Sequence, residues 1–194
     1  YIPVEGIVTE AYLCGKLETL FKKVSEYTTK SNVKDSAAAN NTDAGTERHV
    51  VCALDIKAIL KHVTFDDPSA VFDAGVAAYL LNPLKSSYTY DDMAKEYLNG
   101  RILPTREELL GKKTAEKAWE ESVEGLTFWA CYMAYTAFAC QVPMCETLRE
   151  TGMWNVYTQI ELPLIFTLDS MEKWGISVKG EELKSYGEKL NVRI

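Results

Sequence analysis

The sequence predicts a helix-dominated α/β fold with a small, mostly parallel sheet. Two apolar runs rich in β-branched residues, 49–54 and 70–72, each precede a helical segment. Strand, helix, strand, helix in that order is typical of a parallel layer. From residue 89 onward the pattern is helical instead. We therefore expect a small sheet beside a helical array.

Length and composition indicate a soluble globular protein. With 194 residues, of which 47% are hydrophobic and 25% charged, the chain can bury one real core. Its formal net charge is −7. Because phosphate binding needs clustered Lys and Arg, this charge argues against a chain that holds nucleic acid on its own.

The cysteines do not form a recognisable site. There are five, scattered and without a C-x-x-C pair: Cys14, Cys52, Cys131, Cys140 and Cys145. That spacing predicts neither a disulfide framework nor a zinc site. Cys14 and Cys52 lie in apolar surroundings and are interpreted as small core residues, which favours a reducing cytoplasm.

The first 48 residues are expected to form a strand, a helix and a loop. Residues 1–4 are typical of a short strand, and Thr9 of a helix N-cap. Leucine, phenylalanine and valine then recur at helical spacing as far as Val24. Residues 28–48 contain no large apolar side chain except Val33. They cannot bury enough surface to offset the entropy lost on ordering, so we predict a loop or insertion.

The next segment predicts the α/β layer. A buried strand at 49–54 is followed by a short helix at 55–62. A second strand at 70–72 leads into a helix through 77–81, which Asn82 and Pro83 end.

Two capping boxes are predicted at the start of the helical half. They are Thr89 with Asp92 for a helix at 90–98, and Thr105 with Glu108 for a helix at 106–110. Gly111 would close the second of these helices.

A long helical region follows from 114 to 151. Pro143 should kink or split it, because proline removes a backbone donor and clashes with the preceding turn. Residues 125–145 carry no formal charge over 21 positions, which is long enough to cross a bilayer. Their tyrosines, threonines and alanines argue against that role and predict a helix buried on most sides.

The last segment predicts a helix at 153–174 that contains Pro163 and stops at Gly175. A short β segment at 176–178 and a helix at 180–190 complete the chain.

Two stretches resemble a known family. Residues 71–83 (VFDAGVAAYLLNP) with 90–98 (YDDMAKEYL) are similar to the FD-x4-AAYLL-[ND]-P … L-A-x2-YL pattern in the exonuclease domain of family A DNA polymerases. Residues 161–183 are similar to the E-x-PL … ME-x2-GI-x-V segment that leads into the polymerase thumb. Residues 1–20 resemble the family's third strand and following helix.

The resemblance implies a ribonuclease H-like 3′–5′ exonuclease fold, truncated at its N-terminal strands. Residues 1–152 would form the exonuclease-like domain, with 28–48 as a loop or insertion in it. Residues 153–194 would form the helical connection into the thumb. Truncation would leave the strand at 1–4 with an exposed edge, through which the fragment could self-associate.

The metal-binding motifs of the family's proofreading site are not matched. An Asp-x-Glu would lie before Tyr1, and none occurs in the chain. The second motif places Asp55 at an asparagine and Ile59 at the metal-binding aspartate, as in inactive members of the family. The third motif places Ala139 at its tyrosine and Pro143 at its aspartate. Apolar side chains cannot hold the two metal ions of that chemistry.

The resemblance therefore implies a vestigial, non-catalytic scaffold within a DNA-directed DNA polymerase of replication and repair. We expect no catalytic, cofactor-binding or metal-binding residue in this segment, with Mg²⁺ acting in the parent polymerase domain. The expected partners are that domain and, through the parent protein, DNA; no membrane is expected.

Two alternatives remain open. The first is an active metal-dependent exonuclease with displaced ligands, drawn from Asp55, Asp73 and Asp92. The second sets the resemblance aside and leaves an unrelated acidic α/β interaction module.

The four tryptophans divide into two pairs. Trp119 and Trp129 lie on a helical segment rich in Ala and Met, which favours core packing. Trp154 and Trp174 are expected to face the polymerase domain, because domain-facing surfaces are often aromatic.

Overall fold

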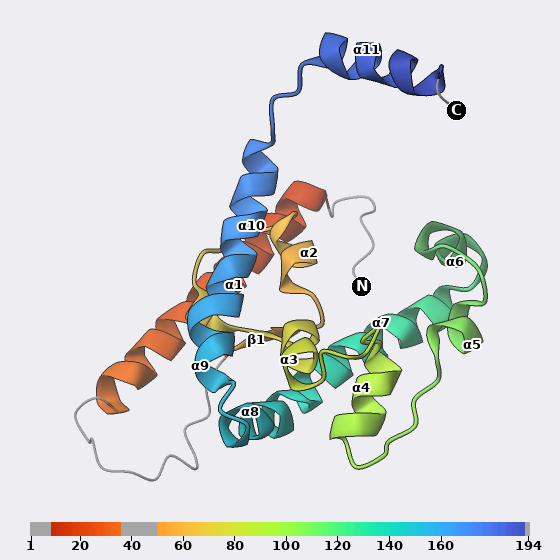
Figure 1. Cartoon of the computed structure of the whole chain (residues 1–194). Helices are drawn as coiled ribbons and strands as arrows, with labels where there is room; N and C mark the ends of the chain where they lie inside the picture. The colour runs from red at the N-terminus through yellow and green to blue at the C-terminus, as the bar shows by residue number, and fades with distance from the viewer. Residues whose placement is uncertain (1–8, 36–49, 193–194) are drawn as a thin grey trace.

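The computed structural model describes residues 9–35 and 50–192, and the strand predicted at 1–4 lies outside them. Helices dominate, and the sheet has two parallel strands, β1 (Val51–Ala53) and β2 (Val71–Asp73) (Figure 1). Val51 pairs with Val71 and Ala53 with Asp73. The predicted helix-dominated α/β class with a small parallel sheet is confirmed.

The helical elements follow the predicted order. They are α1 (Glu10–Asp35), α2 (Ile56–Leu60), the 3₁₀ turn η1 (Pro68–Ala70), α3 (Ala74–Leu81), α4 (Tyr90–Tyr97), α5 (Arg106–Leu110), α6 (Ala115–Glu121), α7 (Val123–Ala139), α8 (Gln141–Glu150), α9 (Trp154–Val156), the π-helical turn η2 (Tyr157–Glu161), α10 (Leu162–Trp174) and α11 (Gly180–Asn191).

Helix α1 is longer than predicted. It continues to Asp35, so the first third of the predicted 28–48 loop is helical. Once a helix has nucleated, each added residue gains one backbone hydrogen bond, and propagation needs no apolar side chain. The remainder of the predicted loop, from 36 on, falls outside the described residues up to position 49.

One predicted capping box is confirmed and the other is wrong. The Thr105 side chain accepts from the Glu108 backbone N–H, and the Glu108 carboxylate accepts from the Thr105 N–H, as a capping box requires. Thr89 makes no side-chain cap at the start of α4. Tyr90 instead anchors that turn: it is buried, and its hydroxyl donates to the Pro104 carbonyl. Packing thus replaces the cap.

The predicted split of the 114–151 helix is confirmed. Helix α7 ends at Ala139, and Pro143 lies in the first turn of α8, where its missing N–H has no helical partner to lose. A further break at Ser122 separates α6 from α7. It allows Gly125 of α7 to approach the Leu109 carbonyl so closely that a Cβ there would lie 2.5 Å from that oxygen.

The helix predicted at 153–174 has the expected limits, but the structure differs from the prediction in two other features of this region. Gly175 ends α10 with a φ of 71°, as expected of a C-terminal glycine. The π turn before Pro163 was not predicted. In it the Leu162 N–H donates to the Tyr157 carbonyl, and this wider turn accommodates a proline that cannot donate to its own preceding turn. Residues 176–178 form no strand, since no neighbouring strand reaches them among the described residues.

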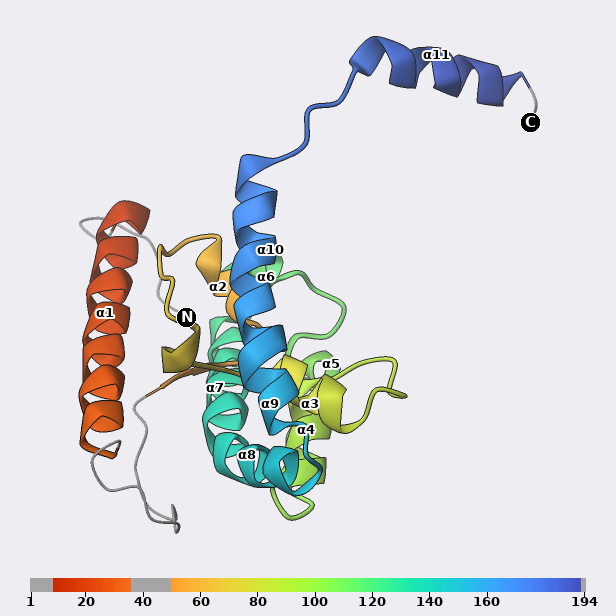
Figure 2. The same ribbon diagram turned by 60° about the vertical axis from the view of Figure 1, so that its left-hand side comes forward.

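The main core lies against the sheet. Helices α3, α7, α8 and α10 surround it, while α1 lies along the other side against η1 (Figure 2). Its most deeply buried large side chains include Ile56, Leu60, Phe72, Met93, Met144, Leu148 and Tyr157. A second, smaller core joins Leu110, Ala118 and Leu126, with Trp119 and Trp129 packed on it, as predicted.

Helix α7 is less buried than predicted. Phe138 is 69% exposed, and Phe128 and Tyr135 are also exposed. Uncharged composition predicted burial on most sides, but it does not say how many neighbours a helix finds. Among the described residues, no helix is both long and apolar enough to cross a membrane.

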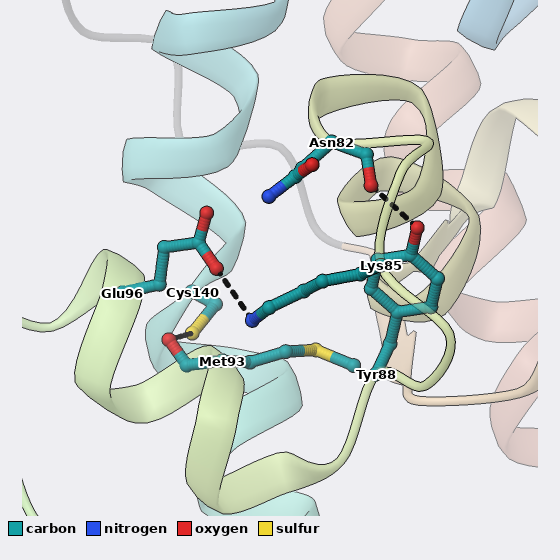
Figure 3. A network of polar contacts seen from close by, with 6 residues as sticks. All are labelled: Asn82, Lys85, Tyr88, Met93, Glu96 and Cys140. Atoms are coloured by element: carbon teal, nitrogen blue, oxygen red, sulfur yellow. Dashed lines mark hydrogen bonds and ion pairs between the residues drawn. The ribbon is translucent and has the colours of Figure 1, made fainter.

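The loop between α3 and α4 is fixed by side chains (Figure 3). The Lys85 ammonium lies 2.8 Å from the Glu96 carboxylate, and the Tyr88 hydroxyl donates to the Asn82 carbonyl. The buried Cys140 thiol contacts the Met93 carbonyl beneath it. The carboxyl end of α3 is thereby tied to α4.

Candidate functional site

The best-organised group of polar contacts lies at the end of β2, around Asp73. This residue is the N-cap of α3, and its carboxylate accepts from the Val76 N–H at 2.9 Å. Its other oxygen accepts from the Ile56 N–H at 2.8 Å, at the start of α2. One side chain that is only 3% exposed therefore joins the starts of two helices to the sheet.

Tyr157 completes this group from the C-terminal half of the chain. Its hydroxyl accepts from the Asp73 N–H at 2.9 Å and donates to the Asp73 carbonyl at 3.1 Å. The ring is 1% exposed and packs against Phe72 and Trp154. The hydroxyl takes the place that a neighbouring strand would have on the outer edge of β2.

Gly75 allows the strands and α3 to meet. Its N–H donates to the Leu54 carbonyl at 3.1 Å. A Cβ at this position would lie 2.5 Å from the same oxygen. Only glycine permits this approach of α3 to the end of β1.

The environment of Asp73 changes its acidity. Burial raises the pKa of its carboxyl to about 6, although the N–H donors of Ile56 and Val76 act in the opposite direction and Asp55 adds a smaller rise. Tyr157 is affected likewise, since burial raises the pKa of its hydroxyl well above the ordinary value. Both groups are therefore neutral or nearly so over a wider pH range than in water.

The three carboxylates proposed as displaced ligands are not brought together. Asp55 is the N-cap of α2 and accepts from the Ala58 N–H at 3.0 Å. It lies near Asp73, close enough to raise that carboxyl's pKa. Asp92 lies in the first turn of α4, a different part of the molecule. The described residues contain no group of three or more His, Cys, Asp or Glu side chains that could hold a metal ion.

The positions that the resemblance assigns to metal ligands have structural surroundings. Ile59 is partly buried and packs on the main core from α2. Ala139 is the last residue of α7, and Pro143 lies in the first turn of α8. None of the three side chains offers an oxygen or nitrogen donor to a metal.

The cysteines are structural. All five lie among the described residues, and none forms a disulfide. Burial raises the pKa of Cys52 to about 12 and that of Cys140 to about 11, so neither thiol ionises readily. Cys52 packs on the core as predicted, although it is only partly buried, and Cys14 on α1 is also partly buried.

The C-terminal end presents an apolar surface that the rest of the described chain does not cover. We call residues 171–192 the C-terminal arm. Its exposed large side chains are Met171, Trp174, Ile176, Val178, Leu183, Tyr186, Leu190 and Val192. Trp174 is 88% and Ile176 91% exposed, and α11 contains no buried residue. Figure 1 shows α11 at the far end of α10, away from the body.

The two tryptophans expected to face a partner differ. Trp174 belongs to the exposed arm. Trp154 packs on the main core and lies beneath the Arg149 guanidinium, 4.3 Å from the ring centre. Core packing therefore accounts for Trp154, and no pattern of neighbouring residues separates it from Trp174. Tyr157 was also missed, because one tyrosine in a helical segment has no distinguishing pattern.

Comparison with known proteins shows a distant similarity to a bacterial DNA polymerase. DNA polymerase I of Bacillus subtilis (strain 168) is 29% identical over 128 residues, which cover 64% of this chain and 14% of that protein. The chain thus spans a small part of the length of the relative it matches. No family model matches the chain, and no solved structure matches it. These findings support a segment related to DNA polymerase I.

Proposed function

We propose that this chain is a non-catalytic 3′–5′ exonuclease-like scaffold within a DNA polymerase I-related protein. Its fold would be a ribonuclease H-like arrangement of a small parallel sheet and helices. The parent would be a DNA-directed DNA polymerase of replication and repair that uses Mg²⁺ in its polymerase domain and contacts DNA. The role of this segment would be to support that domain.

The proposal that the segment is not catalytic rests on the residues found at the expected metal-ligand positions. Ile59 and Pro143 stand where the resemblance places two metal-binding aspartates. Two-metal hydrolysis requires oxygen ligands that hold both ions around the scissile phosphate. Ile59 contributes to the core instead, and Pro143 to the start of α8.

The nearby carboxylates have other partners. Asp55 and Asp73 accept backbone N–H bonds at the starts of α2 and α3. Moving Asp73 to a metal would leave the buried Ile56 N–H unpaired, and a buried donor without a partner costs about 1–3 kcal/mol. The hydrogen bond of Asp55 to the Ala58 N–H is exposed. Hydrogen bonding to the backbone accounts for both aspartates without catalysis.

The C-terminal arm supports the scaffold role. A large apolar surface on a soluble protein marks an interaction site. In a polymerase I-like parent, the polymerase domain follows this arm in the chain, which makes that domain the proposed partner. Trp174 and Ile176 would become buried in the intact protein.

The direct test is a titration of Mn²⁺ into the purified chain by calorimetry, together with degradation of a labelled single-stranded DNA. An active 3′–5′ exonuclease serves as the positive control. We expect neither binding nor degradation.

Metal-dependent degradation would contradict the proposal and favour displaced ligands. Asp55→Asn and Asp92→Asn should then abolish it, with Asp91→Asn as the matched control. The third possibility, an unrelated interaction module, would be favoured if the gene encodes no polymerase domain after this segment.

A further inference from the structure

Polar contacts tie η2 and α10 to the body at two separated places, on either side of the apolar packing of Ile165 and Phe166 on the main core. At the base of this helical segment, the buried Tyr157 hydroxyl forms the two hydrogen bonds with the Asp73 backbone described above. Near its tip, the Lys173 ammonium donates to the Leu60 carbonyl at 2.9 Å and lies 2.8 Å from the Asp169 carboxylate. Lys57 of α2 also pairs with Glu172. Two separated attachments fix the direction of a helix, whereas one would leave it free to pivot.

Both attachments lead to the same short helix. Leu60 is the last residue of α2, and its carbonyl has no partner within that helix. Ile56, the first residue of α2, donates to the Asp73 carboxylate. These contacts therefore form a closed ring. Tyr157 bonds to Asp73, Asp73 bonds to α2, and α2 bonds to Lys173, which lies on the same helical segment as Tyr157. Because α2 has five residues, it spans only about 7 Å and holds its two ends at a fixed separation.

The π turn sets the rotation of the Tyr157 side chain about the helix axis relative to the side chains of α10. Successive residues of an α-helix are rotated by about 100°, so one extra residue in a turn redirects every side chain before it relative to those after it. Tyr157 is the first residue of η2, whereas Asp169 and Lys173 lie beyond it on α10. The turn determines how Tyr157 meets β2 while Lys173 meets α2.

We propose that Asp73, Tyr157, α2 and Lys173 form a frame that fixes the axis of α10 and thereby the direction in which the C-terminal arm leaves the body. Tyr157 and Lys173 act as positioning residues, and Asp73 joins their two attachments. The inference does not depend on the proposed polymerase function, because it concerns contacts within the chain.

The test is amide hydrogen exchange of the full chain, measured for wild type, Tyr157→Phe, Lys173→Met and the double variant. Tyr157→Phe keeps the ring and removes the two hydrogen bonds, so amides of η2 and the base of α10 should exchange roughly five-fold faster or more. Lys173→Met should likewise speed the exchange of amides at the C-terminal end of α10. If the frame is cooperative, the double variant exceeds the product of the two single effects.

Matched controls remove the same chemical groups elsewhere. Tyr88→Phe deletes a hydroxyl that donates to the Asn82 carbonyl, and Lys179→Met deletes an ammonium paired with Glu182 on α11. Both should leave α10 exchange unchanged. Effects of the two frame variants that simply multiply, or no change along α10, would overturn the proposal.

A second measurement reports the orientation of α10 directly, in wild type and in the double variant. Residual dipolar couplings of wild type should fit α10 and the sheet to one alignment, while those of α11 are averaged separately. In the double variant the α10 couplings should fall by roughly two-fold as the helix pivots. Couplings of α10 that already differ from the sheet alignment in wild type would contradict the frame.

Discussion

The main core and the C-terminal arm contain similar apolar side chains at similar helical spacing, yet their surroundings are opposite. Met144 on α8 is completely buried, whereas Met171 on α10 is 61% exposed. In the core, Asp73 and Tyr157 connect the sheet, α2, α3 and α10 through hydrogen bonds. In the arm, the described contacts of α11 are local, such as Lys179 with Glu182. Helical spacing thus predicts a helix, but not whether its apolar face has a partner within the chain.

Replacing the same residue type in the two regions gives the largest expected difference. Met144→Ala should lower the free energy of unfolding by about 2–5 kcal/mol, because it leaves a cavity in the main core. Met171→Ala should change it by no more than about 0.5 kcal/mol, since its side chain is exposed. Denaturant unfolding of both variants checks this. Equal losses would mean that the arm packs on the body in solution.

The acidity of Asp73 should make the core sensitive to pH. Its carboxyl has a pKa raised to about 6, mainly by burial, against about 3.9 in the unfolded chain. The folded state therefore holds the proton more tightly. Its stabilising contribution is fully present below about pH 3.9 and is lost as the pH rises through about 6.

This pH effect can be separated from those of other groups with Asp73→Asn. Relative to that variant, wild type should lose about 3 kcal/mol of unfolding free energy between pH 4 and pH 8. Urea unfolding at several pH values measures the difference. If wild type instead gained stability relative to the variant as the pH rises, the backbone N–H donors would lower the pKa of Asp73 by more than burial raises it.

Two glycines extend the comparison to the backbone. Gly75→Ala should destabilise the protein by about 1–3 kcal/mol, because the new Cβ would lie 2.5 Å from the Leu54 carbonyl. Gly187→Ala on α11 meets nothing within 4 Å and should favour the local helix by about 0.5–1 kcal/mol. Thermal unfolding and helical circular dichroism distinguish the two. A destabilising Gly187→Ala would indicate a neighbour at the arm.

Local rules predicted much of the fold. The Thr105–Glu108 capping box, the helix end at Gly175 and the split near Pro143 depend on residues close in sequence. The failures depended on distant residues. Within residues 9–35 and 50–192, no strand lies beside the segment at 176–178, and the start of α4 is held by the packing of Tyr90 instead of a cap.

The candidate site shows the same limit. Asp55 and Asp73 were singled out from the sequence as possible displaced metal ligands, and the structure places them near each other. Their hydrogen bonds to the starts of α2 and α3 are set by packing across the sheet. Tyr157 lies 84 positions from Asp73 in the chain, so no local pattern could connect the two.

The most direct test of the account is hydrogen exchange of residues 180–191, measured in this chain and in the longer polymerase that the proposed function requires. In the chain these amides should exchange close to the rate of an isolated helix, because α11 has no buried residue. In the longer protein, burial of the arm against the polymerase domain should slow them by roughly 100-fold or more. Equally fast exchange in both would contradict the scaffold role.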